Sequence, residues 1–305
     1  MAAEPTLPGE NVITVLGATG QQGNSVVTAL LRAGWHVRAV VRDLHTVRAR
    51  EAAAAGAQTV VGDFTDRVSL RAAFDGAYGV FSVQPSSGQP GSAVTDDDEV
   101  AYGVSVADIA HSVGVAHLVY SSAIAAGDTV TGIGHFDTKS RIESHIAEIG
   151  IASTIVRPAS FMEILMLPGM GLAHGRLSFL MRAEQAMQFI AVADIGSIVA
   201  EVFGAPTEFL GRAVDIAGDA MTGTRAAQLL SDAVGRPISY ERMSPEVLAG
   251  NAVLGRLAEA VDNGRLAGHA DLPALRTRFP FLHRFDLWLA GPGAYSIGDA
   301  LRTGD

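Results

Sequence analysis

A glycine-rich segment near the start of the chain has the residue types and spacing of a phosphate-binding turn. The sequence NVITVLGATGQQGNSVVTALLRAG places Gly17, Gly20 and Gly23 between a short apolar run and an amphipathic segment. In such a turn one glycine permits the tight bend, another lets backbone N–H groups approach a pyrophosphate, and the third lets helix and strand pack closely. The helix N-terminus then faces the negative charge. The pattern predicts a dinucleotide-binding turn, and an ordinary turn between strand and helix is the alternative.

Charged residues after the next two apolar runs are candidates for contacts with the ribose and the adenine of a dinucleotide. Arg42 follows the second run in the sequence VVRD, where an arginine pairs with the 2′-phosphate of NADP. Asp43 is the competing residue, because a carboxylate there would accept a hydrogen bond from the ribose hydroxyl of NAD. For Arg42 itself, the alternative interpretation is a solvated surface charge. Asp63, in VVGDF, can accept from the adenine amino group or cap a helix. We therefore expect NADP(H), with Arg42 as the bidentate partner.

These residues must be positioned by a regular alternation of strands and helices. Short apolar, β-branched runs predict strands at 12–16, 36–41, 59–61, 79–83, 117–121 and 153–157. Amphipathic segments between them predict helices at 20–33, 44–55, 66–74, 96–113 and 136–149. Glycine follows each helix, at positions 34, 56, 76, 114 and 150, where a residue that accepts positive φ ends a helix. The fold class is therefore α/β, with a Rossmann-type doubly wound parallel sheet.

The alternation loosens after residue 157, which indicates a change of organisation. We expect a flexible tail at 1–10, a nucleotide-binding domain at 11–160, and a smaller C-terminal α/β lobe at 161–305 with elements that return to the main sheet. Within that lobe, strands are predicted at 212–217 and 237–241 and a helix at 224–234. The Ser-, Gly- and Pro-rich stretch 84–95 predicts a loop, and the acidic run 96–99 favours a helix N-terminus.

Composition excludes several classes of protein. Hydrophobic residues make up 48% of the 305 residues and charged residues 18%, which excludes disorder as the dominant state. Cysteine is absent, so disulfides, thiolate metal sites and a cysteine nucleophile are excluded, and no metal site is predicted. The net charge of −10 disfavours nucleic acid and anionic membranes as partners. The first ten residues do not form a signal peptide and no apolar run has membrane-spanning length, so a cytoplasmic protein is expected.

Several motifs together resemble the NmrA-like family of atypical short-chain dehydrogenases. They are GATGQQG, VRD, GDFTD, HFDTKSRIE, RPASFME and the closing LPALRTRFPFLHRFDLWL, which cover nearly the whole chain beyond the tail. That family includes NADPH-dependent quinone and dye reductases, and also NADP-binding redox sensors and transcriptional co-regulators. The resemblance implies a cofactor site in which Gly17, Ala18, Thr19, Gly20, Gln21 and Gln22, with Gly23 behind them, hold the pyrophosphate. It further implies Arg42 at the 2′-phosphate, Asp63 and Phe64 at the adenine, Val83, Gln84 and Pro85 at the middle of the cofactor, and Lys139 with Pro158, Ala159, Ser160 and Phe161 at the nicotinamide.

The position of the usual catalytic tyrosine holds a different residue. Ordinary short-chain dehydrogenases place Tyr and Lys four residues apart on one helix face, whereas this chain has His135 and Lys139. His135 is a candidate proton donor near neutral pH, although a helix-start or exposed histidine is the favoured interpretation. For Lys139 the alternative to cofactor contact is an i,i+4 surface pair with Glu143. Ser121 and Ser122 end the fifth predicted strand, where that class places a substrate-orienting serine, and simple termination of the strand is the alternative.

The activity that this resemblance implies is hydride transfer from NADPH to a quinone-like or other electron-poor acceptor. Its pocket would be lined by Phe161, Met162, Leu165, Met166 and Met170, for which packing in the core is the alternative. Asp194 is expected to cap the helix that follows it. The rival function is a non-catalytic NADP(H)-binding redox sensor with a regulatory protein as partner, and epimerase chemistry ranks last because it needs the missing tyrosine. We expect a monomer or a homodimer.

Overall fold

The computed structural model describes residues 12–87, 93–127 and 130–302, so the predicted tail and part of the predicted loop at 84–95 lie outside the described residues. The chain forms two compact units. The N-terminal unit comprises Met1–Ser122, Ala126–Arg157 and Ile195–Val214, and the C-terminal unit contains the remaining segments. The chain therefore leaves the N-terminal unit after Arg157 and returns to it for two helices and the start of a strand.

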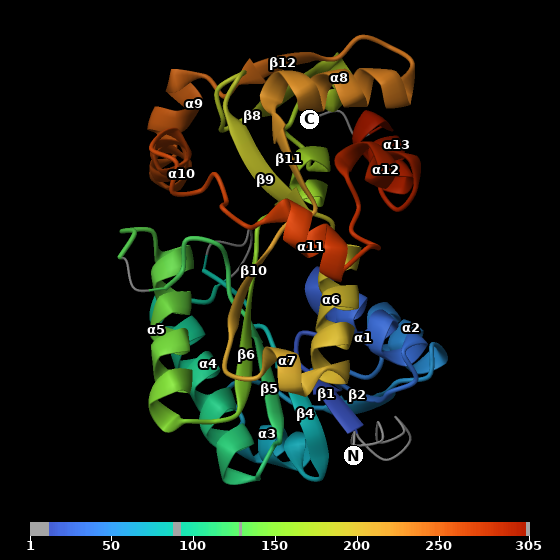
Figure 1. The fold of residues 1–305 in the computed structure, drawn as a ribbon, viewed down its shortest axis with the longest axis vertical. Helices are drawn as coiled ribbons and strands as arrows, with labels where there is room; N and C mark the ends of the chain where they lie inside the picture. The colour runs from blue at the N-terminus through green and yellow to red at the C-terminus, as the bar shows by residue number, and fades with distance from the viewer. Residues whose placement is uncertain (1–11, 88–92, 128–129, 303–305) are drawn as a thin grey trace. The chain divides into compact units, whose positions relative to one another are not determined.

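The N-terminal unit is built on a sheet of seven strands in the order β10-β6-β5-β4-β1-β2-β3 (Figure 1). The strands are β1 (Val12–Val15), β2 (His36–Val41), β3 (Gln58–Val61), β4 (Ala77–Ser82), β5 (His117–Ser121), β6 (Ser153–Pro158) and β10 (Ala213–Ile216). Strands β1 to β6 pair in parallel throughout. The order reverses between β1 and β4, so the carboxyl ends of these two strands form the switch point at which doubly wound sheets bind ligands. The predicted fold class is confirmed.

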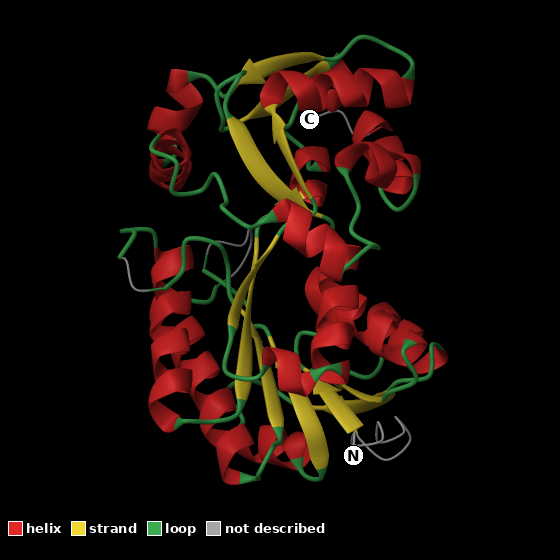
Figure 2. Ribbon diagram, in the orientation of Figure 1, coloured by secondary structure: helices red, strands yellow, loops and turns green. Residues whose placement is uncertain are grey.

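Helices cover both faces of this sheet (Figure 2). They are α1 (Gln21–Arg32), α2 (Val47–Ala54), α3 (Arg67–Phe74), α4 (Asp96–Ser112), α5 (Gly134–Ile149), α6 (Val192–Gly204) and the short α7 (Pro206–Phe209). All five glycines predicted to end helices have positive φ, from 66° at Gly76 and Gly150 to 107° at Gly56. Helix α2 begins three residues later than predicted, because Asp43 accepts from the N–H of His45 and Thr46 caps the helix.

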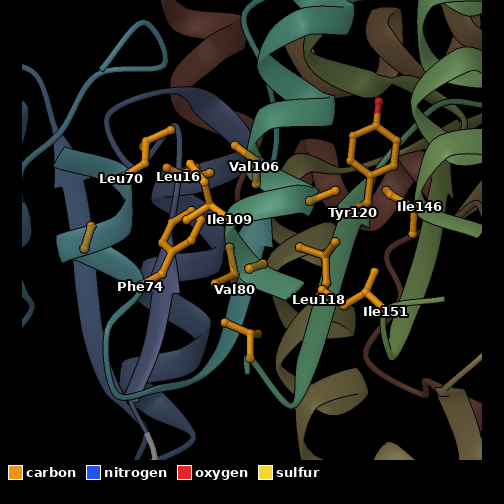
Figure 3. Close-up of a cluster of buried hydrophobic side chains, with 14 of the residues drawn as sticks. Leu16, Leu70, Phe74, Val80, Val106, Ile109, Leu118, Tyr120, Ile146 and Ile151 are labelled. Atoms are coloured by element: carbon orange, nitrogen blue, oxygen red, sulfur yellow. The ribbon is translucent and has the colours of Figure 1, made fainter. Parts of the chain in front are cut away.

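A continuous hydrophobic cluster fixes α3, α4 and α5 on one face of the sheet (Figure 3). Leu118 and Tyr120 of β5 lie beside Ile146 and Ile151, while Phe74 of α3 fills the other end. On the opposite face the ring of Phe203 in α6 packs against Gly79 of β4. Because side chains alternate along a strand, successive residues of β5 point to opposite faces of the sheet.

The C-terminal unit contains two small sheets and a set of short helices. One sheet has the order β11-β9-β7 and the other pairs β12 with β8. The strands are β7 (Ser160–Phe161), β8 (Arg176–Phe179), β9 (Ala186–Ile190), β11 (Asp219–Thr222) and β12 (Ser239–Arg242). The helices are α8 (Gly223–Val234), α9 (Pro245–Gly250), α10 (Ala252–Asp262), α11 (Leu272–Arg278), α12 (Phe285–Ala290), α13 (Ala294–Arg302) and two 3₁₀ turns, η1 (Met162–Met166) and η2 (Leu172–His174). The strands and helix predicted at 212–217, 237–241 and 224–234 correspond to β10, β12 and α8, but β10 pairs into the seven-stranded sheet rather than into a sheet of this unit.

Asp194 does not cap α6, which corrects the sequence-based expectation. It lies inside the first turn of the helix, is 1% exposed, and accepts from both the N–H and the Nδ1 of His283 at 2.8 and 2.7 Å. Burial raises the pKa of the Asp194 carboxyl. The carboxylate therefore fastens the segment before α12 to this unit, a contact between residues 89 positions apart that spacing could not reveal.

In the part of the chain that the structure describes, no helix combines the length and apolar character needed to cross a bilayer. The same residues contain no group of three or more His, Cys, Asp or Glu side chains arranged to hold a metal ion.

Candidate functional site

The glycine turn between β1 and α1 is closed so tightly that a side chain does not fit at its last glycine. Gly17 has φ of 62°, and the N–H of Gly20 donates to its carbonyl oxygen at 2.8 Å. A Cβ on Gly23 would lie 2.1 Å from the carbonyl oxygen of Gly17 and 2.8 Å from the nitrogen of Ala18. Both are backbone atoms, so neither can move without distorting the turn. The turn therefore has the geometry that the sequence predicted, with glycine required at position 17 by its positive φ and at position 23 by the lack of space.

The N-terminus of α1 has no capping side chain. Gly20 is the N-cap residue, no side chain bonds to the first N–H groups, and the first turn has no acidic residue. Thr46, Asp66 and Thr95 cap α2, α3 and α4 through their side chains, whereas α5, like α1, has no side-chain cap. Because the first N–H groups of a helix need acceptors, an anion at this end of α1 would supply them and would meet the positive end of the helix dipole.

Basic residues gather beside this turn. Hydrogen bonds from Thr65 lower the pKa of Asp63, and the charge of Arg42, which is exposed after β2, contributes less. Asp63 accepts from the N–H and hydroxyl of Thr65, whereas Asp66 is the residue that caps α3, so the alternative of Asp63 as helix cap is wrong. Asp43 is likewise engaged in its own turn. Sequence reasoning missed Arg48, whose guanidinium donates to the carbonyl of Thr19 at 2.7 Å.

The ends of β4 and β5 contact the same turn. A Cβ on Gly17 would meet a methyl of Val83 at 2.9 Å, and Ser121 donates to the side chain of Gln22 at 2.7 Å. Gln84 is buried and donates to Ser82, while its side-chain oxygen has no hydrogen-bond partner among the described residues. Phe64, on the other side of the switch point, stacks on Tyr102 at 5.5 Å between ring centroids. The structure thus brings together the turn, Val83, Gln84 and Ser121.

His135 lies in the first turn of α5, is half-buried, and contacts the segment after β4. Its Nδ1 is 3.0 Å from the hydroxyl oxygen of Ser86. Burial, with a smaller contribution from the charge of Lys139, lowers the pKa of His135 to about 3. The imidazole is therefore neutral at pH 7, which disfavours His135 as a proton donor. The reason is desolvation, which disfavours the charged form and depends on packing rather than on spacing.

Lys139 forms a buried ion pair that the sequence did not indicate. Its Nζ lies 2.6 Å from Oε1 of Glu99 in α4, and the two side chains are 9% and 1% exposed. The alternative of a surface pair with Glu143 is wrong, because Glu143 instead accepts from Arg157 and Ser122. A charged side chain that is almost fully buried at the switch-point end of the unit is a candidate for ligand contact.

The segment expected at the nicotinamide belongs to the C-terminal unit. Pro158 ends β6, Ala159 donates to the carbonyl of Ile216, and Ser160 and Phe161 form β7. Among the expected pocket residues, Met162, Leu165 and Met166 are buried, while Phe161 and Met170 are partly exposed. Burial of the first three agrees with the alternative that they pack in the core of this unit.

Comparison with known proteins gives one family across most of the chain. The model of the NmrA-like family matches residues 9–262. The chain is 30% identical over 257 residues to the NAD(P)H azoreductase of Xenophilus azovorans, covering 82% of this chain and 85% of that protein. It is 29% identical over 259 residues to the NmrA-like oxidoreductase ptmS of Penicillium ochrochloron, covering 77% and 76%.

The fold is shared with a solved structure of lower sequence identity. The NADPH-dependent quinone oxidoreductase QOR2 of Escherichia coli, solved in complex with NADPH, superposes with a TM-score of 0.75 at 23% identity. The match covers 91% of this chain and 98% of that one. The expected resemblance is thus confirmed in sequence and in fold.

Proposed function

The chain belongs to the NmrA-like family, and from this premise we propose that it is an NADPH-dependent oxidoreductase that transfers hydride to a small electron-poor acceptor. The observation that carries the proposal is the glycine turn, where Gly23 has no room for a Cβ and the N-terminus of α1 lacks a side-chain cap. The two relatives with the oxidoreductase and azoreductase names support the reaction class.

The residues of the N-terminal unit fit a bound dinucleotide. The turn 17–23 would hold the pyrophosphate, Arg42 the 2′-phosphate, and Asp63 with Phe64 the adenine. Two buried oxygens without partners among the described residues, Oε1 of Gln84 and Oε2 of Glu99, leave acceptors for the hydroxyl groups of a ribose. When bound, NADPH supplies a hydride from its nicotinamide ring.

Arginines favour NADPH over NADH in this proposal. Arg48 is fixed to the turn through Thr19, so its charge is held beside the phosphate-binding N–H groups. Arg42 is exposed at the end of β2 with its guanidinium available for bidentate bonding. Two cations at this edge suit a phosphate better than a ribose hydroxyl.

The acceptor class follows from the absence of a strong acid among the expected catalytic residues. His135 has a pKa of about 3 and Lys139 is held by Glu99. Reduction of a simple ketone needs a proton donor, whereas hydride addition to a quinone gives a stabilised phenolate. An azo group conjugated to aromatic rings is a similarly electron-poor acceptor. We therefore expect quinones and azo compounds to be reduced and unactivated ketones not to be.

The direct test is oxidation of NADPH by the purified chain with panels of quinones, azo dyes and simple ketones, with NADH in parallel and cofactor binding measured first. Turnover of quinones or azo dyes that prefers NADPH is the expected result. A chain that binds neither NADPH nor NADP⁺ would contradict the proposal. Tight binding without oxidation by any acceptor would favour the redox-sensor function instead.

Arg42→Ser should lower the affinity for NADPH by about tenfold while leaving NADH binding nearly unchanged, because only NADPH has the phosphate that the guanidinium binds. Fluorescence titration of both cofactors checks this. Arg50→Ser on the exposed face of α2 is the matched control and should alter neither affinity. Equal weakening of NADPH and NADH would argue against a 2′-phosphate contact.

A further inference from the structure

Glu99 differs from the other acidic residues at the start of α4. Asp98 closes a capping box with Thr95, and Asp97 forms an exposed pair with Arg141 in which its side chain is 92% exposed. Glu99 is 1% exposed and bonds to Lys139 at 2.6 Å. The electrostatic needs of the helix N-terminus are therefore met by its neighbours, and they do not explain why a carboxylate is buried at position 99.

Stability does not explain the pair either. Removing two charges from water costs free energy that their mutual attraction does not always recover, and apolar residues of similar volume commonly serve a fold as well or better. The cost is higher here because the second oxygen of Glu99 is buried without a hydrogen-bond partner among the described residues. A buried ion pair that costs free energy and leaves one carboxylate oxygen without a hydrogen bond is expected where its charges serve ligand binding or catalysis.

We infer that Glu99 is a positioning residue: it fixes the ammonium of Lys139 and balances its charge at the nicotinamide end of the bound cofactor, and so sets the relative affinity for NADPH and NADP⁺. This inference rests on the proposed function, because it requires that the chain binds the cofactor. An ammonium has three donors, so Lys139 can bond to Glu99 and still donate to a ribose hydroxyl.

Among the groups around Lys139, Glu99 is the one whose negative charge balances the positive charge of the ammonium. His135, one turn earlier in α5, is neutral, and Tyr120 of β5 is a buried phenol whose pKa is raised by burial and by Glu99 and Glu143. The carboxylate of Glu143 is already paired with Arg157. Removal of the charge at position 99 therefore leaves the Lys139 ammonium without a counter-ion among these groups.

The two redox states of the cofactor differ by a positive charge on the nicotinamide ring, which is neutral in NADPH and cationic in NADP⁺. An uncompensated ammonium repels the cation, and an uncompensated carboxylate attracts it. The ratio of the NADP⁺ and NADPH dissociation constants should therefore shift in opposite directions when either partner is removed. Loss of packing alone would weaken both cofactors together and would leave this ratio unchanged.

The test measures both dissociation constants by titration for the full chain and for Glu99→Gln, Lys139→Met and the double variant. Glu99→Gln should raise the NADP⁺ to NADPH ratio by about tenfold, and Lys139→Met should lower it by a similar factor. The double variant, which has neither charge, should stay within about twofold of the wild type, since the two effects cancel. Asp97→Asn, which removes a carboxylate of the same helix from an exposed pair, is the matched control and should leave the ratio unchanged.

Opposite shifts that cancel in the double variant would support the inference, and either single variant can show its shift if the other does not fold. An unchanged ratio in the folded single variants would overturn it, as would a shift in Glu99→Gln that persists without Lys139. These failures leave the proposed function standing if the wild type binds NADPH. Absence of binding by the wild type would overturn the proposed function and this inference together.

Discussion

Gly23→Ala should weaken NADPH binding by about a hundredfold, because the added methyl group cannot be placed without opening the turn. Its Cβ would lie 2.1 Å from the carbonyl oxygen and 2.4 Å from the carbonyl carbon of Gly17. Overpacking of this kind costs about 1–3 kcal/mol, and here it displaces the N–H groups that would hold the pyrophosphate. In an unconstrained helix the same substitution would be stabilising by up to about 1 kcal/mol. Titration of the variant with NADPH, beside its thermal unfolding curve, checks the expectation.

The matched control is Gly204→Ala at the end of α6. A Cβ at Gly204 meets no atom within 4 Å, so this variant should bind NADPH as the wild type does. If Gly23→Ala folds and retains wild-type affinity, the turn is not the pyrophosphate site and the proposed function loses its main support.

The second large effect is expected on stability in acid, through buried His117. Burial lowers the pKa of His117 to about 4, from 6.5 in a model peptide. His117 therefore takes up a proton below about pH 6.5 in the unfolded chain but only below about pH 4 in the folded chain. Its contribution to folding stability is thus fully present above about pH 6.5 and is lost as the pH falls from about 6.5 to about 4. At about pH 5 the loss from this one residue is about 2 kcal/mol.

The hydrogen bonds around His117 give the physical cause. Thr154 donates its hydroxyl hydrogen to the carbonyl of Phe209 at 2.9 Å, so it accepts from Nε2 of His117 at 2.8 Å. The other ring nitrogen, Nδ1, is buried without a partner among the described residues. A proton added there would create a buried charged donor with no acceptor, which is strongly disfavoured.

The measurement is urea unfolding from about pH 8 to about pH 5 for the wild type and for His117→Gln, whose amide nitrogen can keep the bond to Thr154 without titrating in this range. The variant should lose about 2 kcal/mol less stability over the interval than the wild type. His111→Gln, on the exposed surface of α4, should show the wild-type pH dependence. Identical slopes for wild type and His117→Gln would refute the assignment.

Local sequence signals were sufficient for the architecture of the N-terminal unit and for its phosphate-binding turn. Strands β2 and β5 begin and end at the predicted residues, and the five helix-ending glycines adopt positive φ. These features depend on nearest-neighbour chemistry: β-branched runs favour strands, and glycine alone tolerates a left-handed backbone cheaply. The same holds for the positive φ of Gly17 and for the close approach of Gly23 to the backbone of Gly17, because both arise within seven consecutive residues.

Only the tertiary structure decided the partners and the protonation of the buried charged groups. Lys139 is four residues from Glu143, yet it pairs with Glu99 from another helix, and Glu143 pairs with Arg157. His135 is neutral because packing partly desolvates it, and Asp194 accepts hydrogen bonds from His283 rather than from the start of its own helix. The sequence by itself determined the sheet, its connections and the turn, since these follow from local conformational preference. Desolvation and long-range pairing depend on which side chains the folded chain brings together, and that information lies in no single segment of the sequence.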